Sequence, residues 1–293
     1  MNVLRIPQIW KNLAAHPLNG STLLVALRWS VWQLRSRLSH EVTIPWVNGL
    51  KLTGRNGMIS ISMQAYNGLH ELRDSCFACH LLNEDDLFFD IGANIGVYSM
   101  ILGHISGARG IAFEPVPKSA EYLTRNLTMN GLLDRVLVVQ AAVSAQTGVV
   151  SMSTDADVMN KIVADGVGIT VPSVTVDSAS AEYGTPQLMK IDVEGFEPAV
   201  IAGAGAVLQD SRLLALILEI NDNARKDGTD TILNILTNSG FVETGYDPKG
   251  RSLIMPFHDG AADNRLFIRA SVKDQIEGRL KVGKPIRVRN KIF

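Results

Sequence analysis

The sequence predicts an α/β protein with a doubly wound, mainly parallel sheet. Two observations lead to this prediction. From Leu87 onward, short and nearly continuous apolar runs alternate with segments of helical pattern, which is typical of parallel strands buried on both faces. The chain has 293 residues, 46% of them hydrophobic, so it can bury the core of one large domain.

The expected elements follow one another from residue 41. Residues 41–66 are predicted to form short strands, with Asn56-Gly57 as a hairpin turn, and residues 69–82 to form a helix. Helices are then expected from about residues 96, 117, 197 and 230, and residues 148–176 to form an irregular insert rich in strands. The last two strands have no obvious helix between them, so we expect them to pair antiparallel. The seven expected strands are LFFDI, GIAFE, RVLVVQAAV, LMKIDV, LLALILEI, GFVETGY and RLFIR.

The chain is predicted to have three parts. Residues 1–65 are expected to form an extension made of a helix and a β-hairpin, residues 66–270 the main domain, and residues 271–293 a basic tail. The last 21 residues, KDQIEGRLKVGKPIRVRNKIF, carry seven Lys or Arg against two acids, and such a run is usually solvated. The alternative is contact with a phosphate-bearing lipid carrier or an anionic glycan.

The N-terminal helix has an apolar stripe and several arginines. The stripe predicts an amphipathic helix that packs on the domain or on a second subunit, as in a homodimer. The alternative is a helix lying on an anionic membrane surface, which Trp29, Trp32 and the nearby arginines would suit. Arg28 interrupts the apolar run, so it is too short to span a bilayer. The stripe consists of Leu23, Leu24, Leu27, Val31 and Leu34.

Charge and cysteine content limit the compartment and the partners. The net charge is −1 and the sequence pI about 6.6, which gives no global electrostatic argument for binding nucleic acid. Two cysteines require no disulfide framework and suit a reducing compartment. Because no signal peptide is evident either, we expect a cytoplasmic protein, in peripheral contact with a membrane if the N-terminal helix lies on one.

Ligands of such sheets bind at the carboxyl ends of the strands. After the strand LFFDI come Asp90, Gly92, Asn94 and Gly96, at the start of a helix whose free N–H groups can face an anion. The G-x-G-x-x-G spacing of dinucleotide loops is missing. Asp90 is poorly placed for a pyrophosphate, but it suits a ligand with a cationic amino group, such as the methionine half of S-adenosylmethionine.

The next two strand ends favour a nucleoside. Glu114 lies about twenty residues beyond the glycine loop, where an acid accepts hydrogen bonds from ribose hydroxyls. This position suits NAD and S-adenosylmethionine equally. After the third strand, Ala142 in the sequence AAVS could let an adenine ring lie against the backbone, although plain close packing explains it as well.

Carboxylates cluster after the fourth and fifth strands. Asp192 and Glu194 follow LMKI, and such a cluster persists where a cationic or protic group lies among its members, namely a sulfonium, a hydroxyl or a metal ion. Glu197 could instead cap the following helix. Glu219, with Asn221 and Asp192, could bind a magnesium-type ion, but convergence cannot be read from sequence and no metal is predicted.

Taken together, these strings resemble FkbM-type methyltransferases, which are similar to the large seven-strand, class I family dependent on S-adenosylmethionine. The resemblance covers about residues 65–270. It rests on DIGANIG, AFEP, Asn126, AAVS, TVDS, KIDVEGFE, LEI and NRLFI in this order. It implies a Rossmann-like sheet with a reversed last strand. It also implies O-methylation of a sugar, a glycolipid or polysaccharide, or a polyketide-type natural product.

The same resemblance assigns roles to residues. It places Asp90, Gly92, Asn94 and Gly96 at the methionine side of the cofactor and Glu114 at the ribose. Asp192 and Glu194 match the acidic motif near the methyl group.

Methyl transfer needs alignment of the reacting atoms and a base for the hydroxyl proton, and we expect Asp192 or Glu194 to be that base. Among the histidines, His70 and His258 could reach the cleft. The alternatives are a nicotinamide-dependent oxidoreductase, which the loop spacing disfavours, and a cofactor-fold binding protein without turnover, which the acidic motif disfavours.

Overall fold

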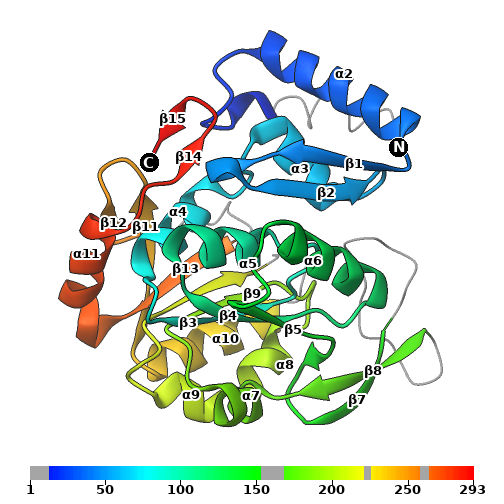
Figure 1. Cartoon of the computed structure of the whole chain (residues 1–293). Helices are drawn as coiled ribbons and strands as arrows, with labels where there is room; N and C mark the ends of the chain where they lie inside the picture. Colours follow the sequence, from blue (N-terminus) through cyan, green and yellow to red (C-terminus); the bar gives the residue numbers. More distant parts are fainter. Residues whose placement is uncertain (1–12, 153–167, 221–225, 258–263) are drawn as a thin grey trace.

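The computed structural model describes residues 13–152, 168–220, 226–257 and 264–293. Its centre is an eight-stranded sheet in the order β12-β11-β13-β10-β9-β3-β4-β5 (Figure 1). The five strands from β10 to β5 are parallel, and β13 runs antiparallel to both of its neighbours. The strands are β3 (Leu87–Ile91), β4 (Arg109–Phe113), β5 (Val136–Val139), β9 (Leu188–Ile191), β10 (Ala215–Glu219), β11 (Phe241–Asp247), β12 (Ser252–Ile254) and β13 (Asn264–Arg269).

This topology confirms the predicted doubly wound, mainly parallel sheet with a reversed last strand. The chain starts at β3, steps outward to β4 and β5, and returns to the other side of β3 as β9. The carboxyl ends of β3 and β9 therefore flank the point where strand order reverses, where such folds bind ligands. The antiparallel pairing of the last two predicted strands, β11 and β13, is also confirmed. The structure adds β12, which pairs with β11.

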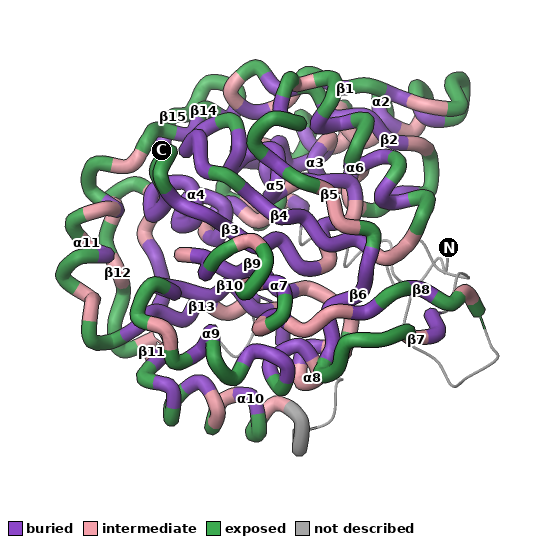
Figure 2. The backbone as a smooth tube through the Cα atoms, turned by 60° about the horizontal axis from the view of Figure 1, so that its bottom comes forward, coloured by how far each residue is buried: buried purple, intermediate pink, exposed green. Residues whose placement is uncertain are grey.

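Helices cover both faces of the sheet, because neighbouring residues of a strand point to opposite sides. Phe88 packs in one core cluster, with α4, α5 and α6, whereas Phe89 packs in the other, with α7 to α10. The central strands β3, β9 and β10 are accordingly almost wholly buried (Figure 2). The helices are α4 (Leu72–Leu81), α5 (Val97–Ile101) with the π-helical turn Leu102–Ser106, α6 (Pro117–Met129), α7 (Val176–Tyr183), α8 (Glu197–Ala202), α9 (Gly205–Gln209) and α10 (Lys226–Asn238).

The N-terminal part differs from the prediction at one turn. The hairpin of β1 (Glu41–Pro45) and β2 (Lys51–Arg55) exists, but its connection is the segment around Val47–Gly49. Asn56-Gly57 instead leads into α3 (Ile59–Asn67), so the predicted strand there is wrong. The helix fits because Ile61 packs directly against Gly54 of β2, where a Cβ atom would lie 2.8 Å from Ile61 Cγ2.

The predicted strand-rich insert is confirmed at its described ends. β7 (Gly148–Met152) pairs antiparallel with β8 (Ile169–Val174), and β6 (Ala142–Val143) adds a third strand. Residues 153–167 of the insert lie outside the described residues. Helix α7, which follows β8, was not predicted. Thr175 begins it with a capping box, in which Thr175 Oγ1 accepts from the Ser178 N–H and Ser178 Oγ accepts from the Thr175 N–H.

The basic C-terminal segment is folded, which corrects the expectation of a solvated tail. It forms α11 (Lys273–Val282) and the short hairpin of β14 (Arg287–Val288) and β15 (Lys291–Ile292). Apolar residues between the charges, Ile276 and Leu280 among them, are buried in the same core cluster as α4. The division of the chain at residues 65 and 270 stays a prediction.

The N-terminal helix α2 (Thr22–Leu38) does not pack on the domain through the predicted stripe, whose contact with a second subunit or a membrane stays a prediction. Val25 and Trp32 are buried, whereas the predicted packing residues Leu23, Leu27 and Leu34 are exposed. Within the part of the chain that the structure describes, no helix combines the length and hydrophobicity needed to cross a membrane.

Candidate functional site

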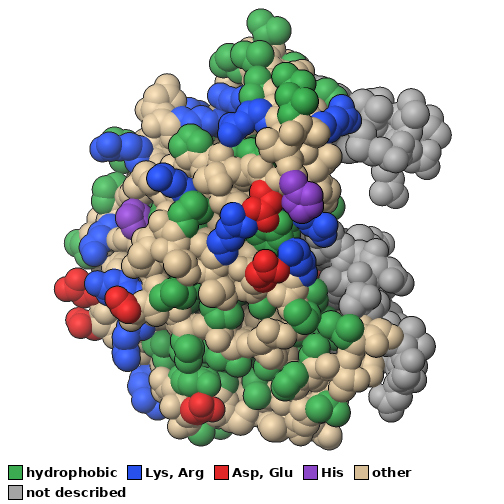
Figure 3. Space-filling view, turned by 45° about the vertical axis from the view of Figure 1, so that its right-hand side comes forward, with side chains coloured by type: hydrophobic (Ala, Val, Ile, Leu, Met, Phe, Trp, Pro, Cys, Tyr) green, Lys and Arg blue, Asp and Glu red, His purple; other side chains and the backbone are tan. Residues whose placement is uncertain are grey.

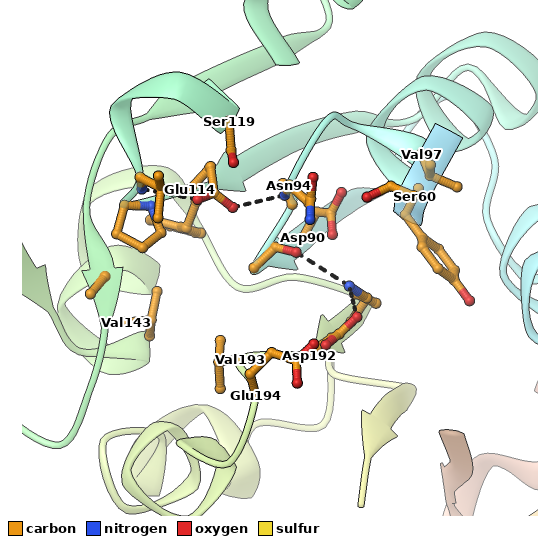
Figure 4. A pocket seen from close by; sticks show the side chains of 18 of the residues that line it. Ser60, Asp90, Asn94, Val97, Glu114, Ser119, Val143, Asp192, Val193 and Glu194 are labelled. Atoms are coloured by element: carbon orange, nitrogen blue, oxygen red, sulfur yellow. Dashed lines mark hydrogen bonds and ion pairs between the residues drawn. The ribbon is translucent and has the colours of Figure 1, made fainter. Parts of the chain in front are cut away.

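A cleft of about 330 Å³ opens at the carboxyl ends of the central parallel strands. This size lies in the range of small-molecule pockets. The loops after β3, β4, β5 and β9 form its walls, α3 contributes Ser60 on the opposite side (Figure 4), and His70 and Glu71 before α4 complete the lining. Seven of the eight predicted site residues line it, and the eighth, Gly96, does not. The seven are Asp90, Gly92, Asn94, Glu114, Ala142, Asp192 and Glu194.

The glycines of the first loop make room for protein atoms. A Cβ atom on Gly92 would lie 1.8 Å from the carbonyl oxygen of Asp192, and one on Gly96 would lie 2.5 Å from Leu123 Cδ1. Both residues have left-handed backbone angles, with φ of 80° and 91°. Close approach of the β9 loop and of α6 therefore requires glycine at these two positions, and Gly92 also lines the cleft.

Glu114 is fixed by backbone donors of two loops. The Asn94 N–H donates to Glu114 Oε2 at 2.8 Å, and the Val116 N–H donates to Oε1 at 2.9 Å. Asn94 reaches this position with a left-handed φ of 50°. Burial raises the pKa of Glu114 to about 7, against the opposing effect of the two N–H groups. Each carboxylate oxygen keeps a second lone pair, so Glu114 can still accept from a ligand hydroxyl.

Asp90 presents an unsatisfied oxygen. The N–H and Oγ of Ser99 donate to Asp90 Oδ2 at 3.0 and 2.6 Å. Asp90 Oδ1 is buried and has no hydrogen-bond partner among the described residues. Burial raises the pKa of Asp90, and nearby Lys190 opposes this rise. A buried acceptor without a donor is costly, so a ligand that donates at this point would be held strongly.

Lys190 belongs to the site, although sequence reasoning missed it. Its ammonium donates to Asp192 Oδ2 at 2.9 Å and lies 5.4 Å from the centroid of the Tyr98 ring. Burial alone would lower the pKa of Lys190, but Asp192 and Asp90 raise it overall. The signal was a lysine inside the apolar strand LMKI, two residues before Asp192 and hence on the same face.

The carboxylates of Asp192, Glu194 and Glu219 converge beside this lysine. One oxygen from each lies within 4.8 Å of the others. Burial and the charge of Asp192 raise the pKa of Glu219 to about 9, so at neutral pH Glu219 keeps its proton and donates it to Asp192. Burial would raise the pKa of Asp192, but Lys190 and this hydrogen bond lower it overall. The structure thus brings Asp192 and Glu219 together, which the sequence left open, and Asn221 lies outside the described residues.

The cluster has the oxygen ligands that a magnesium-type ion prefers. However, the ammonium of Lys190 already compensates Asp192, and Glu219 would have to lose its proton before it could bind a cation well. The donor set is balanced by an ammonium and a shared proton, so we assign no metal-dependent step to it.

Three further residues were considered in the sequence, and the structure describes two of them. Glu197 does not line the cleft, and its Oε1 accepts from the N–H groups of Val193 and Gly195 at 3.1 Å each, in the first turn of α8. Glu197 does lie in the first helical turn, where an acid is favoured. Its two donors belong to the loop before α8, however, and α8 has no side-chain cap hydrogen bond, so the expected cap is not formed. His70 does line the cleft, beside Glu71, whose Oε1 accepts from Asn264 Nδ2 at 2.8 Å. His258 lies outside the described residues.

Comparison with known proteins finds similarity to methyltransferases. The methyltransferase FkbM domain matches residues 90–243. The hexuronic acid methyltransferase AglP of Haloferax volcanii is 30% identical over 143 residues, which are 47% of this chain and 57% of that protein. The methyltransferase sdnD of Sordaria araneosa is 32% identical over 81 residues, 27% of this chain and 31% of that protein. The chain thus matches little more than half of one of these relatives and a third of the other.

Solved structures with a similar arrangement are distant. A putative rRNA methylase from Clostridium thermocellum has a TM-score of 0.42 and 12% identity, over 66% of this chain and 90% of that one. A putative methyltransferase from Streptococcus mutans, solved in complex with SAH, has a TM-score of 0.40 and 12% identity, over 66% of this chain and 93% of that one.

Proposed function

Because the chain belongs to the FkbM methyltransferase family, we propose that its cleft binds S-adenosylmethionine and that the enzyme transfers the methyl group to a hydroxyl. The observation that carries the proposal is that Asp90 lines the cleft and that its buried Oδ1 has no donor among the described residues. The amino group of the methionine half is a donor of the right charge for this oxygen. When bound, S-adenosylmethionine supplies a methyl group activated by a sulfonium.

The chain's own residues bind the ligands and order the reaction. Glu114, held by two backbone N–H groups, accepts from the ribose hydroxyls, and Ala142 leaves room for the adenine ring. Lys190 fixes Asp192 at the rim where the methyl group would lie. Because positioning supplies much of the rate of an in-line displacement, these rigid contacts matter as much as any base.

We assign the general base to Glu194. Asp192 already accepts from Lys190 and Glu219, and its lowered pKa makes it a weak base. Glu194 lies beside Asp192 at the same rim and is only half-buried (Figure 4). A base must reach the acceptor hydroxyl as well as the solvent that finally takes the proton.

The acceptor is proposed to be a sugar hydroxyl in a glycan, glycolipid or polysaccharide, or a hydroxyl of a polyketide-type natural product. Support comes from the name of the relative AglP, a hexuronic acid methyltransferase. The remaining wall of the cleft, where the acceptor would lie, is built by α3 through Ser60 and Met63 and by Met152 of the insert.

The test starts with calorimetric titration of the full chain with S-adenosylmethionine and with NAD. We expect binding of the first only, and a loss of at least about tenfold in affinity for Asp90→Asn, since a hydrogen bond to a charged group contributes about 1.5–3 kcal/mol. The exposed Asp134→Asn is the matched control and should bind normally.

Turnover is tested next, by measuring S-adenosylhomocysteine released in the presence of a panel of hexuronic acid glycans and other hydroxyl acceptors. Glu194→Gln should lower kcat and leave the affinity for S-adenosylmethionine unchanged. Binding of NAD in place of S-adenosylmethionine would point to an oxidoreductase, and binding without turnover on any acceptor would point to a binding protein.

A further inference from the structure

Helix α2 presents an apolar face to the outside of the molecule. At 3.6 residues per turn, six large hydrophobic residues fall within an arc of about 100° on it. Their exposed fractions run from 47% to 78%. Helix α2 forms the upper edge of the molecule in Figure 1, and hydrophobic side chains gather there in Figure 3. A contiguous exposed patch of this kind marks a contact surface. The six residues, here called the α2 arc, are Leu23, Leu24, Leu27, Val31, Leu34 and Leu38.

Arginines flank the α2 arc on both sides. Arg37 lies along one edge, and Arg28 and Arg35 lie along the other. The first 40 residues of the chain carry five Lys or Arg and no Asp or Glu. Arg28 donates to Asn19 Oδ1 and Arg35 to the Thr43 carbonyl, both of them neutral acceptors. Among the described residues, none of these three arginines forms a salt bridge with a carboxylate.

The basic C-terminal hairpin adds to the same positive region. Arg289 donates to the Tyr66 carbonyl, and Lys291 donates to the Pro17 carbonyl, which places β14–β15 beside the start of α2 (Figure 1). A groove of about 470 Å³ runs between α2, β1 and α3, and Arg28, Arg35 and Arg289 are its charged lining residues. An apolar helix, an open groove and three cations without acidic partners therefore share one end of the protein.

We propose that α2 docks the protein on an anionic lipid surface. The α2 arc enters the boundary between headgroups and acyl chains, and the flanking arginines contact lipid phosphates. The charge distribution selects this occupant, because a second copy of the chain would bring the same cationic region against itself. The proposal concerns a surface outside the cleft and does not depend on methyl transfer.

Flotation of the full chain with vesicles tests the proposal. The protein should float with vesicles of phosphatidylcholine and phosphatidylglycerol, less with phosphatidylcholine alone, and less as salt is raised. Leu23→Ser/Leu27→Ser/Leu34→Ser should lower the partition constant by more than about tenfold, given the transfer free energy of buried leucine side chains. Arg35→Gln/Arg37→Gln should cost about fivefold for each charge removed, on the anionic vesicles only.

Val149→Ser, 70% exposed on β7, is the matched control and should float as the wild type does. The substituted leucines are exposed, so the unfolding midpoint should not move. The proposal is overturned if the wild type does not float with anionic vesicles, or if the triple serine variant floats equally well. It is also overturned if light scattering shows a dimer that the triple variant dissociates, since the α2 arc would then be a contact between two copies.

Discussion

Lys190 is the buried cation around which the site is arranged, and its replacement by methionine tests that arrangement. The Lys190 side chain is 6% exposed and its partner Asp192 is 29% exposed, with 2.9 Å between Nζ and Oδ2. Removing one member of a buried pair costs about 3–5 kcal/mol, because the other charge is left uncompensated. We expect Lys190→Met to lower the free energy of unfolding by about 3 kcal/mol at neutral pH, the lower end of that range, because Asp192 keeps contact with water.

The pH dependence of this loss has a defined sign. Burial would raise the pKa of Asp192, but Lys190 lowers it overall, so the pair's contribution is present above the unfolded-state pKa of about 4 and is lost as the pH falls through the folded value. Without Lys190, burial raises the pKa of Asp192 and raises that of Asp90 further. Their ionisation then opposes folding at neutral pH but not in acid. The stability difference between wild type and variant should shrink as the pH falls towards about 4.

Urea unfolding followed by tryptophan fluorescence measures the effect. Lys118→Met is the control, because the Lys118–Glu121 pair also spans 2.9 Å but its side chains are 52% and 64% exposed. It should cost less than about 1 kcal/mol. Lys190→Met/Asp192→Asn should recover part of the loss, since the stranded charge is gone. If Lys190→Met costs no more than Lys118→Met, the ammonium does not hold the site together.

Three further outcomes are expected. Affinity for S-adenosylmethionine should fall as the pH drops below about 7, where Glu114 protonates and becomes a poorer acceptor; calorimetry should show this for the wild type, and a weaker affinity without the change near pH 7 for Glu114→Gln. Gly92→Ala should lower the melting temperature more than Gly131→Ala, because both have positive φ but only at Gly92 does a Cβ atom meet backbone, at 1.8 Å. Asn126→Ala should cost about 3 kcal/mol in urea unfolding, since this buried side chain makes three hydrogen bonds to backbone groups of residues 53 and 95.

The alternation of strands and helices could be predicted because its signal is local. Each parallel strand is buried on both faces and therefore appears as an apolar run, such as LFFDI or LALILE. The acid at the end of a run, or just after it, then marks the ligand edge of the sheet, which is why Asp90, Glu114 and Asp192 were found without a structure. The order of apolar runs and acids along the sequence was therefore enough to predict the parallel strands and these three residues of the cleft.

The hydrophobic pattern gave the wrong prediction where contacts with distant parts of the chain determine the structure of a segment. The sequence MISISMQAY alternates as a strand would, yet it forms α3 because Ile61 fits against Gly54 of the preceding strand. The stripe on α2 could face the domain, a second subunit or a membrane; the helix packs on the domain through Val25 and Trp32 and leaves the leucines of the stripe exposed. Helical periodicity identifies an apolar stripe, but an exposed stripe and a buried one have the same spacing.

The acidic cluster around Asp192 also depends on contacts that the sequence does not show, in this case contacts between charged groups. The sequence suggested that Asp192 and its neighbours need a cationic or protic group among them, and a sulfonium, a hydroxyl or a metal ion was expected to be that group. Period-two alternation already placed Lys190 on the same face as Asp192. The register of β3 with β9 could not be predicted from the sequence. This register places Lys190 opposite Asp90, so that Lys190 is the counterion of Asp90 on β3 as well as of Asp192 after β9. The ammonium of Lys190 thus compensates most of the repulsion between carboxylates that the sequence indicated. Asp90 Oδ1 remains without a donor among the described residues, and it is the atom of the site that a ligand can bind.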